Sequence, residues 1–398
     1  MISPAEAEAA IRGAIGSYPS VVQRLEDLVG AVLREPIRGT RDQPPFDRVT
    51  MDGIAFSHAA YAQGRRSFRI AGTQAAGAPA QKLEDPGTCI EVMTGAVVPE
   101  GCDCVVPVEK ISITDGAASV SEEALATAGL NIHGQGIDSR AGDPLLTAGT
   151  YLGPAEIAVI ASAGLTEAVV SKSPRIIVIS TGDELVEPGQ PIEDWQIYRS
   201  NVYALLAALR NRGYGHLAHD HLPDDLPTLR TRLGAHLQHH DAMILSGGVS
   251  MGRFDYVPQV LQELGVKPIF HKIAQRPGKP MWFGVGKAGQ CVYALPGNPV
   301  STLVCLARYV FAGLAAAQGR PITTSEFAAL DTDFEVKPAL TFFLPVSLRW
   351  QGSSLIAQPR PTKGSGDFTS LLGTDGFVEL PPGPQVVSKA TPLPLYRW

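Results

Sequence analysis

The sequence has 398 residues, a formal net charge of −6 and 44% hydrophobic residues, which is typical of a globular protein with about two to four domains. It contains no Lys/Arg-rich block of the kind that binds nucleic acid, no apolar run near the ~20 residues of a membrane span, and no N-terminal secretory signal. We therefore expect a cytoplasmic protein that binds neither nucleic acid nor membranes. The number of cysteines is odd, and the one close pair, Cys102 and Cys104, lacks the spacing of a zinc site, so we interpret them as reduced structural thiols.

The predicted secondary structure of the first 174 residues changes twice, from helical to β-rich and back to helical. Residues 1–46 carry two helical patterns, one starting near Pro4 and a longer one over residues 21–33. Residues 47–140 contain short β-prone runs separated by Gly and Pro, which predicts a small β-rich lobe. A helix is then predicted from Pro154 to Ala163. We expect residues 141–174 to pack back on residues 1–46 as a helical linker domain, with the lobe as an insertion.

The segment 175–322 alternates strands with helices. Strands are predicted at 175–180, 241–245 and 291–295, and helices from about Asn201, Leu226, Tyr256 and Pro299. Parallel strands need helical crossovers, so this alternation predicts a doubly wound, mainly parallel sheet. Residues 323–398 return to short strands and prolines, which predicts a small C-terminal β-barrel. The expected fold class is thus α/β multidomain, with a helical linker, an inserted β-rich lobe and a C-terminal barrel.

Three of the predicted strands end in unusual loops. Ligands of open parallel sheets bind outside the carboxyl ends of the strands, where glycine lets backbone amides approach an anion and helix N-termini favour negative charge. These loops therefore predict a pocket for a nucleotide-like ligand. Their residues are Thr181, Gly182, Asp183 and Glu184; Ser246, Gly247, Gly248 and Ser250; and Pro296, Gly297, Asn298 and Pro299.

Acids and cations lie near the same strand ends. Carboxylates beside phosphate usually indicate a bridging Mg²⁺, and a group of cations can hold an oxyanion. The acids are Asp183, Glu184, Asp224, Asp225 and Asp255, and the cations are Lys272, Arg276 and Lys279. Each signal also has a simpler interpretation: a tight turn for the glycine pair, ordinary helix caps for Asp224 and Asp225, and a solvated face for Lys272 and Arg276.

Five ordered motifs of this segment resemble the molybdopterin molybdenumtransferase family, of the MoeA and gephyrin E-domain type. They are S-T-G-D-E-L at 180–185, P-G-Q-P-I-E-D-W-Q-I-Y-R-S-N at 188–201, S-G-G-V-S-M-G followed by Asp255, K-I-A-x-R-P-G-K-P at 272–280 and L-P-G-N-P-V-S at 295–301. Outside this segment, M-D-G at 51–53, M-T-G-A at 93–96, Asp138 with A-G at 141–142, the run 149–164 and S-G-D-F-T-S-L at 365–371 follow the same order. The resemblance covers nearly the whole chain.

The resemblance implies the final step of molybdenum cofactor synthesis. Adenylylated molybdopterin would be hydrolysed with Mg²⁺, AMP would leave, and molybdate would enter the dithiolene. It also implies a homodimer, formed in part by the linker domain, whose site lies between the sheet of one subunit and the lobe of the other. Functional partners would be the adenylyltransferase of the preceding step and recipient molybdoenzymes.

The resemblance assigns roles residue by residue. Catalytic roles fall to Asp52, Glu184, Asp255, Lys272 and Lys279, and metal binding to Asp224 and Asp255. Substrate binding falls to Thr94, Asp138, Thr181, Gly182, Asp183, Ser246, Gly247, Gly248, Ser250, Arg276, Pro296, Gly297, Asn298 and Pro299.

Several positions depart from the family pattern. Ile54 replaces an aromatic residue, His133 a permanent cation, Ile137 an acid, Arg253 an acid and Arg276 a lysine. Imidazole is mostly neutral at pH 7, which would weaken anion binding at His133. These departures leave a second hypothesis, a paralogue that binds or carries the pterin without full transferase activity. A third, the adenylyltransferase itself, is disfavoured because those proteins lack the lobe and the barrel.

Overall fold

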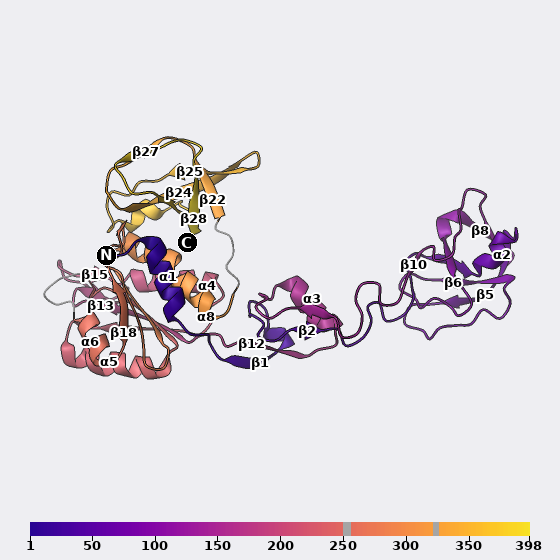
Figure 1. Cartoon of the computed structure of the whole chain (residues 1–398), viewed down its shortest axis with the longest axis horizontal. Coiled ribbons are helices and arrows are strands. Elements are labelled where there is room, and N and C mark those ends of the chain that lie inside the picture. Colours follow the sequence, from indigo (N-terminus) through magenta and orange to yellow (C-terminus); the bar gives the residue numbers. More distant parts are fainter. Residues whose placement is uncertain (250–255, 321–325) are drawn as a thin grey trace.

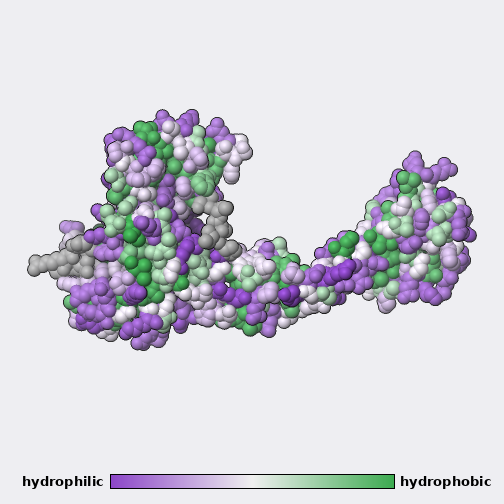
Figure 2. All heavy atoms as spheres, viewed as in Figure 1, coloured by the Kyte–Doolittle hydropathy of each residue, from purple (hydrophilic) through white to green (hydrophobic). Residues whose placement is uncertain are grey.

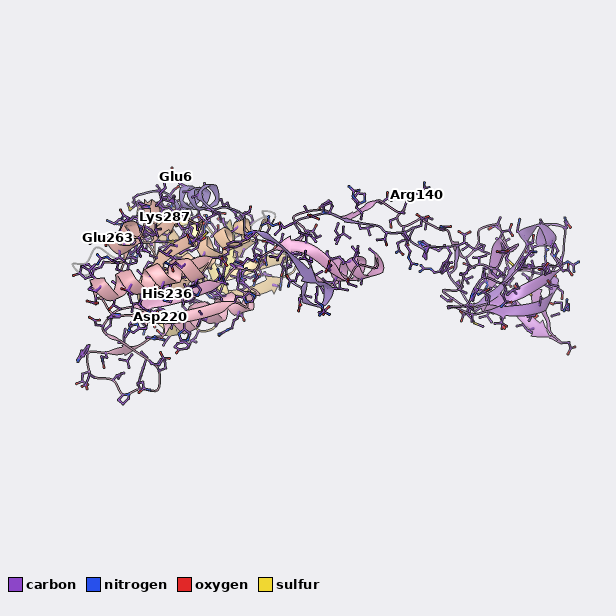
Figure 3. The ribbon with its side chains drawn as sticks, turned by 90° about the horizontal axis from the view of Figure 1, so that it is seen from below. Glu6, Arg140, Asp220, His236, Glu263 and Lys287 are labelled. Atoms are coloured by element: carbon purple, nitrogen blue, oxygen red, sulfur yellow. The ribbon has the colours of Figure 1, made fainter. Side chains whose placement is uncertain are left out.

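The computed structural model is elongated and describes residues 1–249, 256–320 and 326–398. Figure 1 shows the α/β sheet and the C-terminal barrel at one end, a small linker in the middle and the β-rich lobe at the far end. Hydrophilic residues gather along the narrow connection between the linker and the lobe (Figure 2). Arg140 lies in this connection (Figure 3). Ser250, Arg253 and Asp255, which carry site predictions, lie outside the described residues.

The central sheet has six strands in the order β16-β13-β17-β21-β20-β18. The first four are mutually parallel, and β20 runs antiparallel to both of its neighbours, β21 and β18. This confirms the doubly wound, mainly parallel sheet. Their bounds are Leu217–Leu222 (β16), Ile176–Thr181 (β13), Ala242–Ser246 (β17), Cys291–Leu295 (β21), Trp282–Val285 (β20) and Lys267–His271 (β18).

Helices cover both faces of this sheet. One core cluster joins a sheet face to α1 (Pro4–Ala14), α4 (Asn201–Asn211) and the helical run α7 (Pro299–Cys305), η3 (Leu306–Val310) and α8 (Phe311–Ala317). The other cluster holds α5 (Leu226–His239) and α6 (Val257–Glu263). α1 begins at a capping box between Ser3 and Glu6 and buries Ala7 and Ile11. This first helix therefore packs on the α/β sheet rather than on the linker.

The run Pro299–Ala317 is, among the described residues, the one helix whose length and composition would allow it to cross a membrane, but 72% of it is buried inside the protein. Its Arg308 is 5% exposed and forms ion pairs with Glu8 of α1 and Glu379 of the barrel. Arg308 therefore joins three parts of the chain, as expected of a core helix.

The linker contains fewer helical residues than the sequence predicts. Residues 21–33 do not form a helix: β1 (Ser20–Arg24) pairs antiparallel with β12 (Glu167–Ser171) and is followed by the short η1 (Leu25–Asp27). The adjacent β-branched Val21 and Val22 favour this strand, and its partner lies far along the chain, so local periodicity could not reveal it. A second pair joins β2 (Ile37–Arg38) to β11 (Pro144–Leu146). The predicted helix is present as α3 (Pro154–Ser162).

The lobe is built on a six-stranded sheet in the order β7-β4-β6-β5-β9-β8. Phe56 and Phe68 stack in its core with ring centroids 4.5 Å apart, and all five cysteines of the chain are free thiols. Its elements are β3 (Arg48–Val49), β4 (Gly53–Phe56), α2 (His58–Ala62), β5 (Ser67–Gln74), β6 (Thr88–Val92), β7 (Cys104–Pro107), η2 (Val108–Lys110), β8 (Ile111–Thr114), β9 (Ala117–Val120) and β10 (Ile132–His133).

The C-terminal part is a closed β-barrel, as predicted. The pairing of β24 with β26 closes the series β24-β25-β22-β28-β26, and β19 extends β24. Its strands are β19 (Gln275–Arg276), β22 (Glu326–Leu330), β23 (Phe334–Val336), β24 (Thr341–Gln351), β25 (Ser354–Pro359), β26 (Gly376–Leu380), β27 (Gln385–Val387) and β28 (Pro392–Arg397), with η4 (Phe368–Leu371) between β25 and β26.

Candidate active site

The carboxyl ends of β13, β17 and β21 open into one cavity of about 630 Å³. These strands are neighbours in the sheet, so their loops meet at one edge, and the N-termini of α4 and α7 lie there as well. The predicted residues that line the cavity are Thr181, Gly182, Glu184, Asp224, Ser246, Gly247, Gly248, Pro296, Gly297, Asn298 and Pro299. Separated loops thus share one space, as the ligand-site hypothesis requires.

Two glycines are required by the shape of this wall. Gly247 has φ +104°, and a Cβ there would lie 2.7 Å from the carbonyl oxygen of Thr181. Gly248 has φ +67°, and its Cβ would lie 2.7 Å from Cγ2 of Val257 and 2.9 Å from Oγ1 of Thr181. Any larger residue would combine a left-handed backbone with a clash. The glycine pair is therefore more than an ordinary tight turn, because it lets two strand-end loops approach each other closely.

Asn201, the first residue of α4, ties the loops together. Its Nδ2 donates to Oγ of Ser246 (2.8 Å) and to the carbonyl oxygen of Gly297 (2.7 Å), with a longer contact to Oγ1 of Thr302 (3.4 Å). One side chain thus connects the segment after β13 with the ends of β17 and β21. The site predictions omitted Asn201; its signal was the Ser-Asn pair at a predicted helix start inside a family-like motif.

The acids separate into different roles. Glu184 and Asp224 line the cavity. Asp183 instead accepts a hydrogen bond from the backbone N–H of Asp224 (3.2 Å), so it positions a lining residue. Asp225 caps α5 by accepting from the backbone N–H of Thr228 (2.9 Å), and the hydrogen bonds from Thr228 lower the pKa of this carboxyl. For Asp225 the simpler interpretation as a helix cap is correct.

The predicted cations lie outside the cavity wall. Lys272 and Lys279 belong to the segment between β18 and β20, and Arg276 lies in β19, which pairs with β24 of the barrel. None of the three lines the cavity, although the adjacent Pro280 does. Among the described residues, the cation that does line it is Arg199, which follows β15 (Ile197–Tyr198) and was not predicted. β15 pairs with β14 (Leu185–Val186), and this pairing brings Arg199 to the cavity.

The predicted lobe residues form two pairs far from this cavity in the same chain (Figure 1). The backbone N–H and the hydroxyl of Thr94 donate to Oδ1 of Asp52 (2.6 and 2.7 Å), and these bonds lower the pKa of Asp52. Nε2 of His133 lies 2.9 Å from Oδ1 of Asp138. Asp52, Thr94 and Asp138 therefore cannot act on a ligand in their own chain's cavity without a large motion.

A histidine-rich region lies beside the sheet edge. Asp220 of β16 receives hydrogen bonds from Nε2 of His236 and Nη2 of Arg232 on α5, both at 2.6 Å (Figure 3). Within the described ranges, no three His, Cys, Asp or Glu side chains are grouped as a metal site. The Asp220 cluster is therefore an ion-pair network between strand and helix.

The donor set of the cavity fits Mg²⁺ bound together with a ligand. Mg²⁺ is typically held by one or two carboxylates, waters and substrate phosphates, so a cluster of three protein ligands is not needed. Glu184 and Asp224 supply two carboxylates to the same space. The oxygen chemistry is suitable, and no described His or Cys side chain lines this cavity.

Fold and cavity together define a class: a multidomain α/β protein with a cavity for a small ligand at the carboxyl ends of its parallel strands. Three family models match consecutive parts of the chain. They are the MoeA N-terminal region (domains I and II) at residues 2–164, a probable molybdopterin binding domain at 177–334 and the MoeA C-terminal region (domain IV) at 328–395.

Relatives match over most of their length. A molybdopterin molybdenumtransferase of Synechocystis is 40% identical over 400 residues, covering 100% of both chains, and that of Haemophilus influenzae is 35% identical, covering 74% of this chain and 72% of its own. The crystal structure of a molybdopterin biosynthesis MoeA protein from Pyrococcus horikoshii matches with a TM-score of 0.81 and 30% identity, covering 100% of this chain and 99% of the other. The chain therefore belongs to the molybdopterin molybdenumtransferase family and is a transferase.

Proposed function

We propose that this chain completes molybdenum cofactor synthesis, by hydrolysing adenylylated molybdopterin, releasing AMP and inserting molybdate into the dithiolene. One observation carries the proposal: loops from three adjacent strands, predicted separately from sequence, form one cavity with glycines, hydroxyls and two carboxylates. The family membership supports the substrate class.

The residues have chemically distinct roles in this proposal. The backbone at Gly248 and the N-terminus of α7 receive the phosphates, since amide donors and helix dipoles favour anions. The N–H of Gly247 instead donates to the carbonyl oxygen of Leu295 (3.2 Å). Glu184 and Asp224, with Asp255 outside the described residues, would hold Mg²⁺, which when bound neutralises charge on the phosphates. Lys272, Arg276 and Lys279 reach the ligand only if their segment or the ligand extends beyond the cavity wall.

The lobe acts in trans in this proposal. Asp52 is an exposed, ionised acid whose orientation is fixed by Thr94, and it lies far from its own chain's cavity. A homodimer that places this acid opposite the cavity of its partner would give the lobe a role in the reaction. We propose that the linker contributes to this dimer.

The test is a single-turnover assay with adenylylated molybdopterin, Mg²⁺ and molybdate. Wild-type protein is expected to release AMP. Glu184→Ala should lower the rate of AMP release at least about hundredfold, because removing a charged group positioned at the reaction typically has an effect of this size. Glu193→Ala, an exposed acid outside the cavity, is the matched control and should keep the rate. Equal rates for both variants would contradict the assignment of Glu184.

A carrier function is the second candidate. The imidazole of His133 is engaged by Asp138 at 2.9 Å, so it is a poor replacement for a free cation. A carrier would retain bound pterin but release no AMP in the same assay.

A further inference from the structure

Arg199 is the one cation among the described residues that line the cavity. Its side chain is 7% exposed, while the acids Glu184 and Asp224 line the same space. A ligand group with two negative charges entering this space meets two carboxylates and one guanidinium. The guanidinium is therefore the attractive charge among the described parts of the wall.

The hydrogen-bonding capacity of this guanidinium is incompletely used. Its Nη2 lies 2.6 Å from Oε2 of Glu187, but its Nε is buried and has no hydrogen-bond partner among the described residues. A guanidinium carries five N–H donors, and buried donors in native proteins are nearly always paired. Glu187 is 44% exposed and also accepts a hydrogen bond from the hydroxyl of Tyr203. The carboxylate can therefore return to solvent if Arg199 binds something else.

Two neighbouring polar atoms are likewise buried without a hydrogen-bond partner among the described residues. Oγ1 of Thr181 and Oδ1 of Asn201 are buried without a hydrogen-bond partner in the described structure, and both residues line the cavity. Thr181 can donate and Asn201 can accept. All three unpartnered atoms belong to residues that line one cavity, and one of these residues is a buried cation. The atoms themselves are buried, so a ligand group completes them only when these side chains turn toward it.

We propose that Arg199 is a specificity-determining residue that binds a tetrahedral oxyanion of the substrates, with Glu187 as its exchangeable counter-ion. The oxyanion is molybdate or the phosphate of the nucleotide, which share charge and geometry. Arg199 binds it through the planar fork that suits such oxygens. This inference deepens the proposed function and rests on it for the choice of ligands.

The test compares four variants of the full chain: Arg199→Gln, Arg199→Lys, Glu187→Gln and Arg230→Gln. Arg230 of α5 pairs with Glu263 of α6 and does not line the cavity, so its variant is the matched control. Sodium molybdate is titrated by equilibrium dialysis and AMP by calorimetry, and thermal unfolding verifies the fold of each variant. If Arg199→Gln does not fold, Arg199→Lys carries the test, because it keeps the charge and loses the fork.

We expect Arg199→Gln to weaken binding of at least one anion about 10- to 100-fold, the range for a hydrogen bond to a charged group, and Arg199→Lys to weaken it less. Glu187→Gln should bind equally or more tightly, and Arg230→Gln should match the wild type. A loss in the molybdate arm alone assigns the oxyanion to molybdate, and a loss in the AMP arm alone assigns it to the phosphate.

Two results would overturn the inference. Wild-type affinity of the Arg199 variants for both anions would show that the guanidinium does not bind them. An equal loss in Glu187→Gln would show that the ion pair only holds the chain together. Failure of the proposed function gives a different result. In that case the wild-type protein binds at least one of the anions through Arg199 but releases no AMP from adenylylated molybdopterin.

Discussion

Asn201 provides a direct test of how the cavity is held together. Asn201→Ala removes the Nδ2 donor shared by Ser246 and Gly297. Each hydrogen bond contributes about 1 kcal/mol net, and an unpaired buried acceptor costs about 1–3 kcal/mol. Ser246 is buried whereas Gly297 is exposed and can bind water instead. We therefore expect the free energy of unfolding to fall by about 2 kcal/mol.

Asn201→Asp is the sharper perturbation because it preserves shape. It replaces a donor with a carboxylate oxygen that faces the carbonyl of Gly297, and it adds a negative charge to a cavity with two lining carboxylates. The free energy of unfolding of Asn201→Asp should fall by about 3 kcal/mol. Its affinity for AMP should fall at least tenfold, which corresponds to about 1.4 kcal/mol of binding free energy.

The assay is urea unfolding followed by tryptophan fluorescence, to which Trp282 contributes as the tryptophan buried in the α/β core. Asn211→Ala at the other end of α4 is the matched control, since Asn211 is exposed, and it should change stability by less than about 0.5 kcal/mol. If Asn201→Ala is no more destabilised than this control, the hydrogen bonds of Asn201 do not hold the loops.

Three other predictions address the glycine wall, the lobe and the core helix. Gly247→Ala should destabilise the protein by more than about 2 kcal/mol in the same urea assay, because a Cβ there would clash with the loop of a neighbouring strand. Gly289→Ala is the control: Gly289 also has a positive φ but has open space around it, so this change should cost about 1 kcal/mol. Thr94→Val should raise the pKa of Asp52 in a carboxyl NMR titration, because it removes one of the bonds that lower it; an unchanged pKa would contradict this cause. Since the folded pKa of Asp52 is depressed, its stabilising contribution is present above the unfolded pKa of about 3.9 and is lost as the pH falls through the folded value. Arg308→Met should lower unfolding stability by about 3–5 kcal/mol, because it leaves the partly buried Glu379 without its cation and Glu8 with Arg12 alone; a loss below 1 kcal/mol would show that these carboxylates are solvated.

The sequence alone determined the α/β core and the strand-end loops of the cavity. β13, β17 and β21 are short apolar runs between turn residues, and α4, α5 and α7 carry helical spacing with recognisable starts. These signals are local, because side-chain period and capping act over a few residues. The glycine, serine and acidic residues of the loops come directly after the predicted strand ends, so they could be identified as site candidates from the sequence.

Only the tertiary structure decided the features that depend on distant partners. Residues 20–24 form a strand because residues 167–171 pair with them, and α1 packs on the sheet although it begins the chain. In the same way, Arg199 and Asn201 line the cavity while Lys272 and Lys279 do not, because the path of the chain after β14 and β18 sets which side chains face inward. Local patterns record which element forms, but the neighbours of a side chain depend on pairing and packing across more than a hundred residues.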